Sequence, residues 1–255
     1  MSLADKKALI TGACSGIGYA IGEEFLRNDA KVLIVVDIHL TEPESIASWR
    51  AKYPKASVKY FSVDVRLDEK LKKCYEDVEK AFGSLDIVVN CAGIMGEHDY
   101  KRMIDINFAG MIGSSLYAIE NMRKDGKGSG GVIVNFASIV GVEPVSVCPV
   151  YSATKVGINA FHRSVAHDND QLGIKFLSIC PGLTETSLFD NKTHPGFHYL
   201  ATAEKLQKTR AAMKSQKPDV ISTGLIKLIH EAKNGSVWVI EEGKWREEIF
   251  PELKY

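Results

Sequence analysis

The segment Thr11-Gly12-Ala13-Cys14-Ser15-Gly16-Ile17-Gly18 decides the fold, because it joins an apolar strand to an amphipathic helix through three glycines. Glycine lets the backbone turn tightly and approach a ligand, and the first N–H groups of a helix carry a positive partial charge. Such a turn suits a pyrophosphate. The spacing is GxxxGxG rather than GxGxxG, so an ordinary strand-to-helix turn is the alternative at this point.

The alternation of strand and helix continues along the chain. Runs of Val, Ile and Leu predict strands over 7–11, 31–37, 58–64, 86–90, 132–138, 174–180 and 236–240. Longer amphipathic segments predict connecting helices over 17–28, 68–82, 100–122, 152–171 and 219–234. Near-continuous apolar strands are typical of sheets covered on both faces. We expect an α/β fold with one doubly wound (Rossmann) parallel sheet of about seven strands.

Length and composition suit a single globular unit. The 255 residues are 45% hydrophobic and 25% charged, which is ordinary for a protein with a sizeable core. We expect one dinucleotide-binding and catalytic domain over 1–255, because no Pro/Ser-rich linker or repeat divides the chain. The segment at about 183–217 interleaves apolar residues with Lys, Thr, His and Pro, as expected of a cover over the substrate.

Charge and cysteine usage limit the partners and the compartment. Lys+Arg and Asp+Glu are balanced at 32 each, so no overall basic field would gather nucleic acid or an anionic membrane surface. No stretch has the roughly 18 uninterrupted apolar residues of a membrane span. The five cysteines form no CxxC, and an odd number suits a reducing compartment. We expect a cytoplasmic protein with neither nucleic acid nor a membrane as partner.

Asp37 ends the second predicted strand, 19 positions after Gly18. An acidic residue at about this distance accepts hydrogen bonds from an adenosine ribose and repels the extra phosphate of NADP. No Lys or Arg lies within 11–19, and Ile38 follows Asp37, so a 2′-phosphate would have only His39 as a nearby partner. The sequence therefore predicts NAD as the cofactor. The alternative is an ordinary strand-end Asp that starts a turn.

Two further strand ends extend this nucleotide site. Asp64-Val65 ends the third predicted strand, and Asn90-Cys91-Ala92-Gly93 ends the fourth. Both lie where an adenine and its ribose would extend from a pyrophosphate on the glycine-rich turn. Each is ordinary by itself, and their shared placement at strand carboxyl ends is the informative part.

Tyr151 and Lys155 are four residues apart, which on a helix brings both side chains to one face. A free tyrosine has a pKa of about 10, so a phenol that acts as a general base needs its phenolate stabilised. Lys155 and an oxidised nicotinamide are both cationic and can supply that stabilisation. A lone YxxxK is common by chance, and its alternative is a solvated helix face.

Ser138 and Asn107 add polar groups to this pair. Ser138 closes the fifth predicted strand, and Gly141, Pro144 and Pro149 suit a loop that returns toward the sheet. A hydroxyl and a phenol can thus meet at one substrate oxygen. Asn107 is polar within an apolar stretch of the helix predicted over 100–122, and its alternative is a helix irregularity satisfied by its own amide.

Together these motifs resemble the short-chain dehydrogenase/reductase family over essentially the whole chain. The motifs that carry the resemblance are TGxxxGIG at 11–18, Asp64-Val65, the NAG-like 90–93, Asn107, Ser138, Tyr151, Lys155, and Pro181-Gly182 with Thr186. Within the family, the chain is similar to the NAD-dependent insect alcohol dehydrogenases and to 15-hydroxyprostaglandin dehydrogenase-like members. That similarity rests on Asp37, Gly-Gly-Val-Ile-Val-Asn at 130–135, and Pro149-Val-Tyr-Ser-Ala-Thr-Lys155.

The resemblance implies a role for each motif residue. Tyr151 is the base or acid, Ser138 holds the carbinol oxygen, Lys155 binds the nicotinamide ribose, and Asn107 supports a water-linked proton relay. Pro181-Gly182 and Thr186 border the carboxamide. The full set expected at the cofactor is Gly12, Cys14, Ser15, Gly16, Ile17, Gly18, Asp37, Asp64, Val65, Asn90, Ala92, Gly93, Tyr151, Lys155, Pro181, Gly182, Thr184 and Thr186. A homodimer or homotetramer, packed through the helices that carry Asn107 and Tyr151, is also implied.

The expected activity is oxidation of an apolar secondary or allylic alcohol by NAD. Terpenoid, retinoid, prostaglandin-like and short aliphatic alcohols all remain open. Apolar side chains that can bury hydrocarbon, and cannot pair a charged group, are expected at the substrate: Met95, Ile139, Val140, Val145, Cys148, Leu183 and Leu188. The alternatives are an NADPH-dependent carbonyl reductase and a catalytically idle nucleotide-binding protein on the same fold.

A metal site is not expected. His194 and His198 are four residues apart, but Pro195 opposes a helix between them and no third ligand converges in the sequence.

Overall fold

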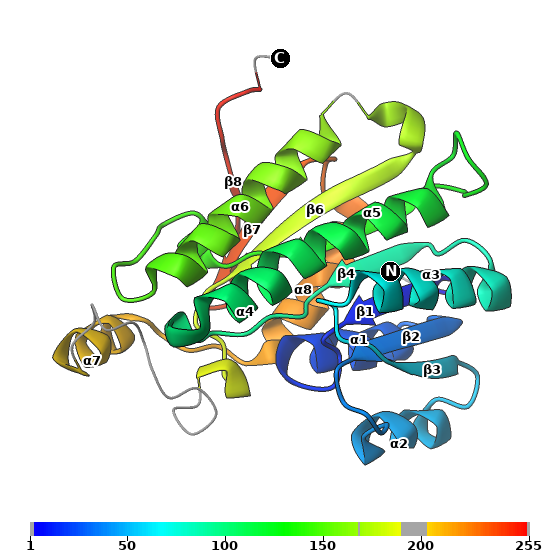
Figure 1. Cartoon of the computed structure of the whole chain (residues 1–255), viewed down its shortest axis with the longest axis horizontal. Coiled ribbons are helices and arrows are strands. Elements are labelled where there is room, and N and C mark those ends of the chain that lie inside the picture. Colours follow the sequence, from blue (N-terminus) through cyan, green and yellow to red (C-terminus); the bar gives the residue numbers. More distant parts are fainter. Residues whose placement is uncertain (1–2, 168, 190–202, 254–255) are drawn as a thin grey trace.

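The strands lie side by side in one twisted sheet, and helices cover both of its faces (Figure 1). The computed structural model describes residues 3–167, 169–189 and 203–253. The strand order is β3-β2-β1-β4-β5-β6-β7-β8, with β8 antiparallel to β7 and the other pairs parallel. The predicted single-domain, doubly wound α/β fold is confirmed.

The elements have the following bounds. The strands are β1 (Lys7–Thr11), β2 (Val32–Asp37), β3 (Ser57–Ser62), β4 (Ile87–Asn90), β5 (Gly131–Phe136), β6 (Ile174–Pro181), β7 (Ser236–Glu241) and β8 (Lys244–Glu248). The helices are α1 (Gly16–Arg27), α2 (Glu44–Lys52), α3 (Asp68–Phe82), α4 (Tyr100–Ile104), α5 (Met111–Met122), α6 (Pro149–Ala166), α7 (Ala203–Ala212) and α8 (Pro218–Glu231).

Two apolar layers sandwich the sheet, because successive strand residues point to opposite faces. In β1, Ala8 and Ile10 pack with the apolar side chains of α1, α2 and α8. Leu9, between them, packs with those of α3 and α5 on the other face. The order of the strands reverses between β1 and β4, and the carboxyl ends of parallel strands open a crevice at such a point.

The structure differs from the predicted elements in several places; the helices α2 and α7, for example, were not predicted. The helix predicted over 100–122 is interrupted: a π-helix, Asp105–Gly110, separates α4 from α5. The strand predicted over 132–138 ends at Phe136, so Ser138 lies beyond it. The edge strand β8 was not predicted, because Lys244-Trp-Arg-Glu-Glu248 is charged rather than apolar.

The predicted cover at about 183–217 is described only in part. Residues 190–202, including His194 and His198, lie outside the described residues. At the two ends of the segment, Thr184 and Gln216 form a parallel β-bridge, and the Gln216 side chain donates to the Ile240 carbonyl at 2.8 Å. The segment therefore leaves the sheet and returns to it at one place. Its function as a cover stays a prediction.

Helix α6, with 18 residues, is the longest described helix. It carries the charged residues Lys155 and Arg163 within its apolar pattern. Among the helices of the described ranges, none combines the length and the apolar character needed to cross a membrane.

Candidate active site

The glycine-rich turn between β1 and α1 is packed too tightly for any larger residue. Gly12 has φ +70°, and a Cβ atom there would lie 2.7 Å from the Ala92 Cα atom. A Cβ atom on Gly18 would lie 2.2 Å from the Gly12 carbonyl oxygen. The turn therefore presents bare backbone and the N-terminus of α1 to the crevice, which is what a pyrophosphate requires.

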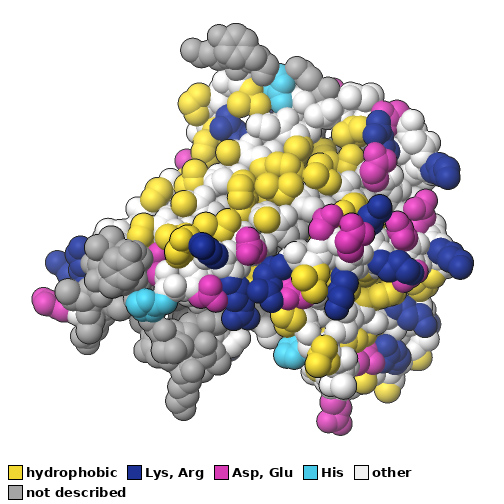
Figure 2. All heavy atoms as spheres, in the orientation of Figure 1, with side chains coloured by type: hydrophobic (Ala, Val, Ile, Leu, Met, Phe, Trp, Pro, Cys, Tyr) yellow, Lys and Arg dark blue, Asp and Glu magenta, His cyan; other side chains and the backbone are white. Residues whose placement is uncertain are grey.

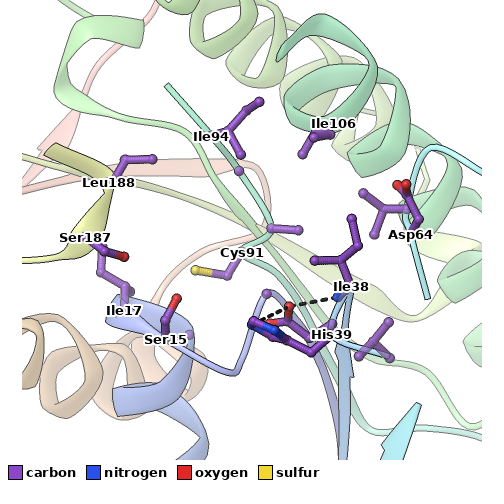
Figure 3. Close-up of a pocket in the computed structure, with 18 of the residues that line it drawn as sticks. Ser15, Ile17, Ile38, His39, Asp64, Cys91, Ile94, Ile106, Ser187 and Leu188 are labelled. Atoms are coloured by element: carbon purple, nitrogen blue, oxygen red, sulfur yellow. Dashed lines mark hydrogen bonds and ion pairs between the residues drawn. The ribbon is translucent and has the colours of Figure 1, made fainter. Parts of the chain in front are cut away.

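A cavity of about 440 Å³ opens beside this turn (Figure 3). Ser15 and Ile17 border it from the glycine-rich segment, Cys91 and Ile94 from the chain after β4, and Leu188 from the chain after β6. The expected cofactor residues that line it are Gly12, Ser15, Gly16, Ile17, Gly18, Asp37, Asp64, Val65, Ala92, Gly93 and Thr186. One site thus joins the carboxyl ends of five strands, β1, β2, β3, β4 and β6.

The other expected cofactor residues lie around this cavity rather than on its lining. Asn90 is buried, and its amide donates to Ser115 Oγ at 2.9 Å and to Asn135 Oδ1 at 2.8 Å. The hydroxyl of Thr184 donates to the Gly182 carbonyl at 3.0 Å. Both side chains bond within the protein, and their contribution to a cofactor site stays a prediction. Pro181 ends β6 and stands beside Ile240 of β7.

Asp37 is fixed at the end of β2 by backbone donors. Its Oδ2 atom accepts from the Cys14 N–H at 2.9 Å, and its Oδ1 atom accepts from the Ile38 N–H at 2.8 Å. His39 Nε2 lies 3.9 Å from the Oδ1 atom. The carboxylate therefore connects the carboxyl end of β2 to the glycine-rich turn.

Asp64 forms an ion pair with Arg66, two residues further along the chain. Arg66 donates to both carboxylate oxygens, with Nε 3.0 Å from each. This hydrogen bonding lowers the pKa of the Asp64 carboxyl, although partial burial acts in the opposite direction. Asp64 is thus a fixed anion on the cavity wall.

Helix α6 places Tyr151 in its first turn and Lys155 one turn later. Both side chains are buried, with exposed fractions of 4% and 5%. The Lys155 ammonium lies 5.5 Å from the centre of the Tyr151 ring and donates to the Phe136 carbonyl at 2.8 Å. The predicted pair therefore faces the sheet rather than solvent, and the alternative of a solvated helix face is wrong.

Burial changes the acidity of both groups. It raises the pKa of the Tyr151 phenol above its ordinary value, and a hydrogen bond with Ser138 only partly opposes the rise. It lowers the pKa of Lys155 to about 8. The phenol is therefore protonated at neutral pH unless further positive charge arrives next to it.

Asn107 lies in the π-helix that interrupts the helix predicted there. Its Oδ1 atom accepts from the Ile94 N–H at 2.8 Å, and its Nδ2 atom donates to the Ile94 carbonyl at 2.9 Å. A Cβ atom on Gly93 would lie 3.5 Å from the Asn107 Oδ1 atom and 3.8 Å from the Lys155 ammonium. The irregularity is real, and the amide is satisfied by the chain after β4 rather than by its own helix.

An apolar cluster surrounds the phenol. Most of the residues expected at the substrate belong to it or pack against it: Met95, Ile139, Val140, Val145, Cys148 and Leu188. Leu183 is not part of this cluster; its carbonyl accepts from the Gln216 N–H at 2.9 Å. Within the described ranges, no group of three or more His, Cys, Asp or Glu side chains could hold a metal ion.

Asn159 supports the candidate site from within α6 and was not predicted from the sequence. It lies one turn beyond Lys155 on α6, and its amide donates to the Gly141 carbonyl at 3.0 Å. Its Oδ1 atom accepts from the Ser178 hydroxyl of β6 at 2.7 Å. It thereby ties the loop after Ser138 to both α6 and the sheet. Its spacing could have predicted it, because Tyr151, Lys155 and Asn159 follow one another at intervals of four residues on one helix face.

Comparison with known proteins agrees with this geometry. Residues 6–195 match the short chain dehydrogenase family. Alcohol dehydrogenase 1 of Ceratitis cosyra is 35% identical, covering 95% of this chain and 94% of its own. The 15-hydroxyprostaglandin dehydrogenase [NAD(+)] of Rattus norvegicus is 32% identical, and the match covers 96% of this chain and 94% of its own.

Solved structures agree as well. L-sorbose reductase from Gluconobacter frateurii, complexed with NADPH and L-sorbose, superposes with a TM-score of 0.79 at 25% identity, covering 94% of this chain and 97% of its own. ElxO with NADP bound superposes with a TM-score of 0.78 at 27% identity, covering 94% of this chain and 98% of its own. With its glycine-rich turn and buried Tyr-Lys pair, the chain belongs to the short-chain dehydrogenase/reductase family of nicotinamide-dependent oxidoreductases, in the branch of the insect alcohol dehydrogenases and 15-hydroxyprostaglandin dehydrogenase.

Proposed function

We propose that this protein oxidises an apolar secondary or allylic alcohol to its carbonyl with NAD. The observation that carries the proposal is the apolar cluster around Tyr151, which lies where the chain after β4 and the start of α6 meet. Transfer of a hydrocarbon group from water into such a cluster is favourable. A charged group would lose its hydration there without a partner to replace it. Several relatives are named alcohol dehydrogenases, which supports the same substrate class.

The chain's own residues would handle the proton and the oxygen of the alcohol. The Tyr151 phenolate takes the hydroxyl proton, and Ser138 donates a hydrogen bond to the substrate oxygen. The Lys155 cation favours the phenolate and would hold the nicotinamide ribose. A bound nicotinamide supplies the hydride acceptor and adds positive charge near the phenol. Asn107, whose side chain holds the backbone of Ile94, would support a water-linked path for the released proton.

Asp37 supports NAD rather than NADP. The carboxylate is held in place by two N–H groups, and a 2′-phosphate beside it would bring two like charges together. The opposite preference has support too, because two similar solved structures hold NADP or NADPH. A carbonyl reductase that uses NADPH is therefore the second candidate function.

A panel of substrates with both cofactors tests the proposal. Terpenoid, retinoid, prostaglandin-like and short aliphatic alcohols are offered with NAD and with NADP, and charged hydroxy acids and sugars serve as controls. The expected result is the highest kcat/KM on an apolar alcohol with NAD. A higher kcat/KM with NADP, or the fastest turnover on a charged hydroxy acid or a sugar, would contradict it. NAD binding without turnover on any compound would favour a nucleotide-binding role.

We further propose that the protein is a cytoplasmic homodimer or homotetramer. Figure 2 shows hydrophobic side chains gathered over α4–α6, and the exposed apolar residues of these helices are Tyr100, Ile104, Leu116 and Val156. A contiguous apolar face of this kind is typical of a subunit interface. All five cysteines are free thiols, which fits a reducing compartment.

A further inference from the structure

Glu97 is a buried carboxylate that the proposed chemistry does not use. It lies in a short 3₁₀ helix, Glu97–Asp99, after β4, and 2% of its surface is exposed. Its Oε1 atom accepts from the Tyr151 N–H at 2.8 Å, and its Oε2 atom accepts from the Val150 N–H at 3.1 Å. A side chain 54 positions earlier therefore contacts the backbone of the proposed base itself.

These two contacts complete the hydrogen bonding of the first turn of α6. The N-cap residue Cys148 makes no side-chain capping hydrogen bond, and Pro149 has no N–H to satisfy. The Ser152 N–H already bonds to the Cys148 carbonyl at 2.9 Å. Val150 and Tyr151 are thus the two N–H groups left over, and Glu97 accepts from both.

The N-terminus of α6 also stabilises the negative charge of Glu97. Burying a carboxylate is costly unless it is paired or hydrogen-bonded. Over 3–167, 169–189 and 203–253, no Lys, Arg or His side chain forms an ion pair with Glu97. The positive end of the helix dipole, together with the two N–H groups, favours a negative charge here.

We propose that Glu97 is a positioning residue that sets the location of the Tyr151 phenol; this rests on the proposed function of Tyr151. Tyr151 lies in the first turn of α6, so its phenol oxygen follows any movement of the helix start. A misplacement of about 1 Å at a reacting group costs roughly 100-fold in rate. The two hydrogen bonds that Glu97 accepts therefore act on the rate through the backbone of residues 150 and 151.

Glu97→Gln tests this with almost no change in shape. A glutamine can accept from only one of the two N–H groups, because its NH₂ group faces the other as a donor. We expect kcat to fall by roughly 10- to 100-fold, with the Kd for NAD within about twofold of the wild type. Glu97→Ala leaves both N–H groups without an acceptor and should lower kcat further.

Asp86→Asn is the matched control. Asp86 also accepts from a backbone N–H, that of Lys7 at 2.9 Å, but at the amino ends of β1 and β4, away from Tyr151. It should lower Tm without changing kcat. If Glu97→Gln lowers Tm as Asp86→Asn does and keeps kcat within about twofold, Glu97 only stabilises the fold and the inference is wrong. Should Glu97→Ala fail to fold, Glu97→Gln still decides.

Amide hydrogen exchange separates this inference from the proposed function. The Tyr151 N–H should exchange faster in Glu97→Gln than in the wild type, whichever substrate the enzyme takes. A wild type with no turnover on the panel would count against the proposed function alone. Unchanged exchange at residues 150 and 151 would refute the helix cap and, with it, the positioning of the phenol.

Discussion

The Tyr151 side chain is buried in surroundings that oppose its ionisation. Burial raises the pKa of the phenol, and the hydrogen bond with Ser138 only partly opposes that rise. In the proposed mechanism, positive charge from Lys155 and from a bound nicotinamide would therefore stabilise the phenolate. The proposal thus needs the phenol, the lysine and the cofactor site close together.

Replacing Tyr151 with Phe should remove the transferable proton and keep the shape of the ring. We expect kcat to fall by roughly 100- to 10,000-fold, while the Kd for NAD stays within about twofold. Tyr75→Phe is the control, since Tyr75 is also a buried tyrosine bonded to a serine, Ser114 at 2.8 Å, but in the core. Turnover that is equal in the two variants would exclude Tyr151 as the base.

Lys155 should lower the stability of the fold at neutral pH and still be required for turnover. Burial lowers its pKa from 10.5 to about 8, so the unfolded chain binds more protons between about pH 8 and 10.5. The free energy of unfolding should therefore rise with pH across that window. Lys155→Met should remove this contribution to the rise, increase stability at pH 7, and abolish turnover. Urea unfolding at pH 7, 8, 9 and 10 measures it, and parallel curves for both proteins would contradict it.

Helix α6 is the element that gathers the site, because Tyr151, Lys155 and Asn159 repeat every four residues along it. Asn159→Ala would leave the Gly141 carbonyl and the Ser178 hydroxyl without their partner. We expect the free energy of unfolding to fall by roughly 1–3 kcal/mol per unsatisfied group. We also expect a lower kcat, because the loop after Ser138 is released.

Asn121→Ala is the control for that variant. Asn121 is buried in α5 and accepts from the Leu85 N–H at 2.8 Å, away from the proposed site. It should lose stability in urea and keep its kcat. A kcat that is unchanged in both variants would leave Asn159 with a structural function only.

Sequence alone predicted the elements whose pattern is local and missed those that depend on tertiary contacts. The parallel strands are near-continuous apolar runs, so β1, β2, β4 and β6 were recognisable. The π-helix was not, because the Asn107 amide that accompanies it bonds to Ile94 of another segment. Glu97 was missed for the same reason, since its partners lie 53 and 54 positions away.

Association between copies of the chain should depend on the helices rather than on loops. Leu116 is 50% exposed on α5, within the apolar face of α4–α6. Leu116→Lys should therefore shift the protein toward a monomer in light scattering. Leu40→Lys, at a residue that is 93% exposed but outside this face, should not. A wild type that is monomeric at high concentration would contradict the proposed homo-oligomer.

The fold should lose stability in mild acid through one buried imidazole. His162 is fully buried in α6, and neither ring nitrogen has a hydrogen-bond partner within normal geometry, although the backbone of Gly235 and Ser236 lies close. Burial lowers its pKa from 6.5 to about 4. The unfolded chain binds more protons between these values, so the free energy of unfolding falls as pH drops through them.

His162→Leu should flatten this acid dependence. The difference in slope from the wild type should approach about 1.4 kcal/mol per pH unit between pH 6 and pH 4.5, measured by urea unfolding. His98→Leu, at an exposed histidine, serves as the control. A slope unchanged by His162→Leu would assign the acid sensitivity to other groups.

Strand β8 has a consequence for the behaviour of the protein at high concentration. It runs antiparallel along β7, and its Lys244, Arg246 and Glu247 are charged. Unpaired strand edges invite other chains to add to a sheet, and charged side chains along such an edge make that addition unfavourable. The charged side chains of β8 should therefore oppose the addition of another chain at this edge of the sheet.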